Sequence, residues 1–126
     1  MQSKIVILSA GCEAHLLQLR NEVLSTSGYT VVSALSALES IDRFCAGDFD
    51  LVLLCHSFSD EEQAVIAQAV HGRSPSTPVL VLTINDRNNR FADVLVGNEP
   101  AALIRAIAQA TSQRFLFNLQ GAELHE

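Results

Sequence analysis

Gly47-Asp48-Phe49-Asp50-Leu51-Val52-Leu53-Leu54-Cys55 is the stretch that decides the fold class of this 126-residue chain. A glycine and two aspartates lead into an unbroken apolar run that ends at Cys55. Such a run is typical of a central strand in a parallel sheet, because helices cover both of its faces and no side chain meets water. We therefore expect residues 50–55 to form a middle strand of an α/β domain.

Short apolar runs alternate with helical periods on both sides of this stretch. This alternation predicts a parallel sheet with helices on both faces. Right-handed crossovers and the chain length favour a flavodoxin-like three-layer sandwich of five strands in the order 2-1-3-4-5. The expected strands are residues 4–8, 29–34, 50–55, 79–84 and 92–96; the expected helices are residues 15–26, one capped by Ser36, one capped by Ser59 and a last one opened by Pro100.

Apolar residues at helical spacing predict which face of each helix is buried. The predicted buried faces are Leu16, Leu17, Leu19, Val23 and Leu24 in the first helix, Leu38, Ile41, Phe44 and Cys45 in the second, and Val65, Ile66, Ala69 and Val70 in the third.

Composition and charge exclude several classes of protein. Hydrophobic residues make up 48% and charged residues 17%, which excludes a disordered chain. A net charge of −6 argues against a nucleic-acid partner. The apolar run 79–84 is far below the roughly 18 residues that cross a bilayer, so no membrane partner is expected. No targeting segment is visible and the three cysteines are an odd number, so we expect reduced thiols and a cytoplasmic location.

Three stretches carry a resemblance to a known family: Gly28-Tyr29-Thr30-Val31-Val32-Ser33-Ala34, the stretch from Gly47 to Leu54 quoted above, and Ser76-Thr77-Pro78-Val79-Leu80-Val81-Leu82-Thr83. They resemble the receiver domain of bacterial response regulators, and the second stretch is the most specific match. The resemblance implies a signal-transduction domain of the two-component phosphorelay type over residues 1–111, with a tail at 112–126.

The residues that serve phosphorylation in that family are missing from the matching positions. The phosphoacceptor aspartate falls at Cys55, and the lysine of strand 5 falls at Gly97. The pair of acids that ends strand 1 falls at Ser9-Ala10, or at Gly11-Cys12 if the match is counted back from Gly28. The strand 4 hydroxyl is retained as Thr83.

Phosphoryl transfer needs a carboxylate nucleophile, a hard cation held by oxygens and a cation on the developing charge. The resemblance therefore implies a pseudo-receiver: a domain without enzymatic activity, cofactor or metal that acts by contact with a signalling partner protein. No nucleophile, base and orienting group can be assembled from the sequence into another catalytic site.

The region around strands 4 and 5 departs from the family in length. Only eight residues separate Thr83 from Ala92, so helix 4 is expected to be short or missing. The tail carries an apolar group that would either cover the exposed sheet or join two chains in a homodimer, which we favour; it consists of Phe115, Leu116, Phe117 and Leu119.

An alternative function uses Cys55 together with Cys12, His15 and His56. Two thiolates and two imidazoles could hold a metal, or a thiol beside an imidazole could respond to oxidants. Against this, Cys55 and His56 are adjacent, so their side chains diverge in a strand. The redox- or metal-responsive reading is kept as the alternative hypothesis.

Overall fold

The computed structural model describes residues 5–55, 57–82 and 101–112, together with the backbone of residues 94–96. No helix in these ranges is long and apolar enough to cross a membrane. The elements are β1 (Val6–Ala10), α1 (Ala14–Thr26), β2 (Thr30–Ala34), α2 (Ala37–Ala46), β3 (Leu51–Leu54), α3 (Asp60–Arg73), β4 (Val79–Leu82), β5 (Val94–Val96) and a helix at residues 101–112.

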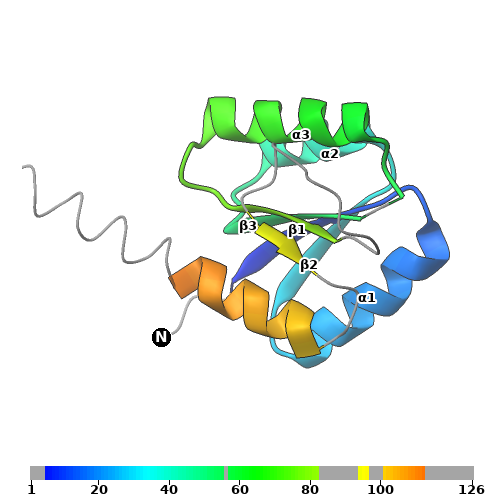
Figure 1. The fold of residues 1–126 in the computed structure, drawn as a ribbon, viewed down its shortest axis with the longest axis vertical. Coiled ribbons are helices and arrows are strands. Elements are labelled where there is room, and N and C mark those ends of the chain that lie inside the picture. Colours follow the sequence, from blue (N-terminus) through cyan, green and yellow to red (C-terminus); the bar gives the residue numbers. More distant parts are fainter. Residues whose placement is uncertain (1–4, 56, 83–93, 97–100, 113–126) are drawn as a thin grey trace, which may run out of the picture.

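The five strands form one parallel sheet in the order β2-β1-β3-β4-β5. Helices α2 and α3 cover one face, and α1 and the helix at 101–112 cover the other (Figure 1). The flavodoxin-like sandwich and its strand order are thus confirmed. The prediction of a short or missing helix 4 falls on residues 83–93, outside the described part of the chain.

Strand β3 supplies both halves of the hydrophobic core. Val52 and Leu54 join a cluster beneath α2 and α3, together with Phe44 and Ile66. Leu51 and Leu53 join a second cluster with Leu24 of α1 and Ile107. All four residues of β3 are buried, as the unbroken apolar run predicts.

Strand β1 differs from its predicted bounds. It ends at Ala10 rather than at residue 8, because Ser9 and Ala10 continue the ladders to β2 and to β3. Both side chains are small and buried, so polarity at Ser9 does not end the strand.

The helix caps follow the sequence. Ser36 Oγ accepts from the backbone N–H of Glu39, and the Glu39 carboxylate accepts from the N–H of Leu35. In α3, Ser59 and Glu62 form a reciprocal capping box. These bonds satisfy N–H groups that have no partner inside the helix.

The predicted helix faces are partly wrong. Leu38 is 71% exposed, Val65 is 51% exposed and Leu19 is 49% exposed, and Cys45 is exposed as well. In each helix, the buried residues occupy a narrower strip of the helix surface than the apolar residues do. At about 100° per residue, Leu38 lies about 120° around α2 from the buried Phe44. Ser40 and Gln63 take buried positions instead.

Ser59→Ala should lower the free energy of unfolding by about 1 kcal/mol, because the substitution leaves the N–H of Glu62 without its cap. Urea unfolding followed by circular dichroism measures the change. Ser25→Ala, at an exposed position inside α1, is the matched control and should be neutral or slightly stabilising. Equal losses in the two variants would contradict the capping role.

Candidate functional site at the carboxyl edge of the sheet

The carboxyl ends of β1 and β3 meet at one edge of the sheet, where parallel α/β folds place their sites. The N–H of Cys55 donates to the carbonyl oxygen of Ala10 at 2.9 Å, so the two strand ends stay paired beyond β3. The N–H of Cys12 donates to Ser57 Oγ at 2.9 Å and joins the two following loops. This edge is therefore held in one arrangement by hydrogen bonds across the loops.

Cys55 is buried, with 2% of its surface exposed. Its sulfur accepts a hydrogen bond from Nη1 of Arg20 at 2.8 Å. Arg20 comes from α1 and makes further interactions of its own. The guanidinium of Arg20 thus lies against the residue that directly follows β3.

Sequence reasoning missed Arg20, although a signal was present. It stands three residues after Leu17 and four before Leu24, the two buried residues of α1. A charged side chain in line with a buried stripe points into the protein and needs a partner there. The identity of that partner depends on the tertiary fold.

Gly11 lies against Cys55 without room for a side chain. A Cβ built on Gly11 would stand 2.8 Å from the Cβ of Cys55 and 3.4 Å from Ser57 Oγ. Its N–H donates to the carbonyl oxygen of Ala34 at 3.0 Å. The absence of a side chain at position 11 lets β1 and the end of β3 pack this closely.

Cys12 is exposed, and its thiol has a pKa above the ordinary value. Desolvation is the largest cause, followed by the Coulombic interactions of this thiol with Glu62 and with Cys55. His15 is exposed on α1. Among the residues that the structure describes, no group of three His, Cys, Asp or Glu side chains is arranged to hold a metal ion.

The remaining predicted site residues divide into two groups. Ser9 and Ala10 lie buried in β1, paired with Leu53 and Leu54 of β3. The others, which are Thr83, Gly97, His56, Phe115, Leu116, Phe117 and Leu119, lie outside the described residues.

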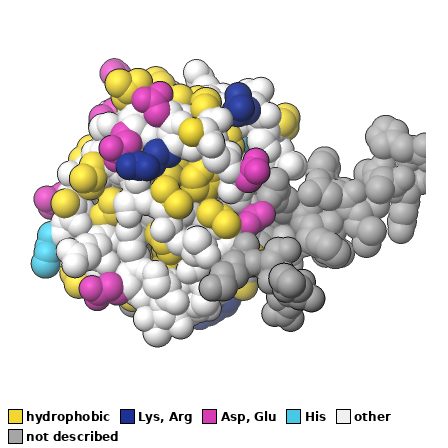
Figure 2. All heavy atoms as spheres, turned by 180° about the vertical axis from the view of Figure 1, so that it is seen from behind, with side chains coloured by type: hydrophobic (Ala, Val, Ile, Leu, Met, Phe, Trp, Pro, Cys, Tyr) yellow, Lys and Arg dark blue, Asp and Glu magenta, His cyan; other side chains and the backbone are white. Residues whose placement is uncertain are grey.

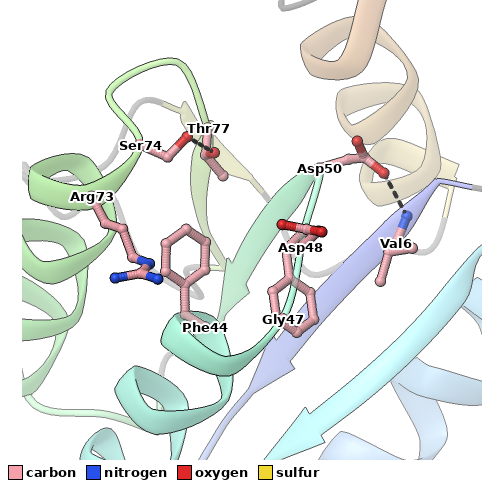
Figure 3. Close-up of a pocket in the computed structure, with 9 residues that line it drawn as sticks. Val6, Phe44, Gly47, Asp48, Asp50, Arg73, Ser74 and Thr77 are labelled. Atoms are coloured by element: carbon pink, nitrogen blue, oxygen red, sulfur yellow. Dashed lines mark hydrogen bonds between the residues drawn. The ribbon is translucent and has the colours of Figure 1, made fainter.

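A hollow of about 370 Å³ opens at the opposite, amino-terminal edge of the sheet (Figure 3). One Asp50 oxygen accepts from the N–H of Val6 at 2.8 Å, and the hydroxyls of Ser74 and Thr77 are bonded to each other at 2.6 Å. These contacts tie strand ends and loops together. We therefore interpret this hollow as a structural feature, formed where strand ends and loops are joined.

Comparison with known proteins identifies the fold. No protein-family model and no curated protein matches the chain. A CheY-like response regulator receiver domain protein from Methanospirillum hungatei has 21% identity and a TM-score of 0.78, covering 89% of this chain and 97% of its own. A receiver domain protein from Clostridium thermocellum has 22% identity and a TM-score of 0.80, with 90% and 98% covered.

An adenylate cyclase from Rhodopirellula baltica is also similar, with 18% identity, a TM-score of 0.82 and coverage of 98% and 99%. At these identities the likeness concerns the fold. The chain has the CheY-like receiver fold over most of its length, as the resemblance in the sequence implies.

Gly11→Ala should lower the free energy of unfolding by about 1–3 kcal/mol, because the new methyl group overlaps the Cβ of Cys55. Gly72→Ala is the control: its Cβ meets nothing within 4 Å, and it should be neutral or stabilising. In the double variant Gly11→Ala/Cys55→Gly the overlap is gone. Its free energy of unfolding should therefore fall by less than the sum of the decreases in the two single variants. Additive losses in urea unfolding would disprove the contact.

Cys12 should react slowly with a thiol reagent near neutral pH, because a raised pKa leaves less thiolate, and the rate should climb as pH rises toward that pKa. In a Cys45→Ser background, Glu62→Gln should lower the pKa of Cys12 and speed its labelling at fixed pH. A Gln side chain at position 62 can still accept the hydrogen bond from the N–H of Ser59 and so keeps the capping box of α3. Glu61→Gln, on the same helical turn, is the charge control; equal acceleration by both substitutions would refute the role of Glu62.

Proposed function

We propose that this chain is a pseudo-receiver: a signalling domain of the receiver family that acts by contact with a partner protein and is not phosphorylated. The observation that carries the proposal is the pairing of Cys55 with Arg20. The family resemblance assigns the acceptor aspartate to position 55, where this chain has a buried sulfur that accepts from a guanidinium at 2.8 Å.

The chemistry of aspartyl phosphorylation supports this proposal. An acceptor carboxylate attacks phosphorus while Mg²⁺, held by oxygens, neutralises the developing charge. The end of β1 offers Ser9, Ala10 and Gly11 toward this edge, and none of them carries a carboxylate. Sulfur is a soft ligand and a poor one for Mg²⁺. Arg20 already provides a positive charge at this position without any metal.

We propose a cytoplasmic, non-enzymatic module without a cofactor, because among the described residues of the carboxyl edge no nucleophile has a base beside it. Homodimerisation through the tail remains a prediction. The redox- or metal-responsive alternative gains no specific support, since Cys55 is buried and His15 points to solvent from an exposed position.

Incubation with acetyl phosphate and Mg²⁺ should leave the intact mass of the protein unchanged, whereas a phosphorylation-competent receiver domain treated in parallel gains one phosphoryl group. Cys55→Asp should also remain unmodified, because the new carboxylate pairs with Arg20 and the acids that bind Mg²⁺ are still missing. A phosphoryl adduct on the wild-type chain, mapped to the carboxyl edge, would overturn the proposal.

A further inference from the structure

A groove of about 520 Å³ runs between α1 and β2, the strand at one end of the sheet. Its α1 wall extends from residue 14 to residue 26, which is about 18 Å at 1.5 Å per residue. The other wall includes Ser33 and Leu35, at the end of β2 and just beyond it. The groove is therefore as long as an extended segment of about five residues.

The outer edge of β2 presents backbone groups beside this groove, which Ser33 lines. The N–H of Thr30 donates to Ile5 and the carbonyl of Ala34 accepts from Gly11, so these residues turn their peptide groups toward β1. Strand geometry then turns the peptide groups of Val31 and Ser33 the opposite way, where the described part of the chain places no further strand. Such an edge is a template for an added strand.

Asn21 supplies a second, independent feature on the α1 wall. Its Nδ2 donates to Ser33 Oγ at 2.7 Å. Its Oδ1 is buried and has no hydrogen-bond partner among the described residues. A buried amide oxygen without a donor is costly. The oxygen is covered in the unbound chain, so an incoming N–H or ammonium group would satisfy it once the Asn21 side chain turns toward the groove.

Charge and apolar surface define what the groove can take. Glu22 lines it, and none of its lining residues is Lys, Arg or His. Residues 1–63 carry nine acidic and three basic residues, and the face in Figure 2 shows scattered Asp and Glu side chains with few Lys or Arg side chains. Leu17 and the 47% exposed Leu35 add an apolar contact at the same groove.

We propose that this groove binds an extended basic segment of the partner protein, which adds a strand to the outer edge of β2 with a lysine or arginine toward Asn21 and Glu22. The inference rests on the proposed function, because it names the partner of the same signalling domain. A second copy of this chain fits less well, since it would bring together two grooves that both carry Glu22 and two chains of net charge −6.

The test is an NMR titration of the full ¹⁵N-labelled chain with the capped peptide Thr-Lys-Thr-Val-Thr-Lys-Thr, in which alternate side chains face the groove. The amide signals of Val31 and Ser33 should shift, and their hydrogen exchange should slow, at peptide concentrations up to about 1 mM. The matched peptide with Glu in place of Lys should bind at least tenfold more weakly.

Variants separate the backbone, amide and charge contributions. Val31→Pro removes one outward N–H without touching the ladder to β1 and should weaken binding at least tenfold. Asn21→Ala, which needs no backbone change, tests the amide and should weaken binding severalfold. Glu22→Gln should weaken binding about threefold through the lost charge, whereas Glu61→Gln on α3 should have no effect.

Three results would overturn the inference: no shift at β2, shifts centred elsewhere, or equal binding of the Lys and Glu peptides. Slow exchange at β2 without peptide, together with a mass that rises with concentration in sedimentation, would assign the edge to a second copy instead. The acetyl phosphate experiment probes the Cys55 edge alone. Failure of the peptide to bind is therefore distinguishable from failure of the non-phosphorylated function.

Discussion

Burial of β3 on both faces is the constraint on which the rest of this structure depends. Its four residues alternate between the core beneath α2 and α3 and the core beneath α1 and the helix at 101–112. A strand of this kind has to lie inside the sheet, and the helices have to lie on both sides of it. The ends of β1 and β3 then share one edge, and their neighbours Gly11 and Cys55 come into contact.

The proposed function depends on that edge. In the receiver family that the sequence resembles, this edge holds a cation between carboxylates, whereas here the guanidinium of Arg20 contacts the sulfur of Cys55. Under the proposed function, signalling then depends on surfaces rather than on a transferable group. We propose the groove between α1 and β2 as such a surface, because it combines the outward backbone groups of β2, an amide oxygen without a partner among the described residues and a carboxylate.

Much of the fold could be predicted from the sequence. The strand order follows from the alternation of short apolar runs with helical periods and from the apolar run at β3. The caps at Ser36 and Ser59 were also readable, because they depend on side chains only three residues away. The exposure of Leu38 and Val65 could not be predicted, because an apolar stripe does not show how much of a helix is covered by neighbouring elements. The Arg20–Cys55 contact joins residues 35 positions apart and emerges only when α1 and β3 are placed together.

The close approach of Gly11 to Cys55 has a consequence for how such a chain can change over evolutionary time. A Cβ atom at position 11 would overlap the Cβ atom of Cys55, so substitutions at the two positions are not independent. A lineage that gained a side chain at position 11 would first have to reshape the end of β3. Conversion into a domain with acidic residues at both strand ends would therefore require a coordinated set of changes rather than one substitution at Cys55.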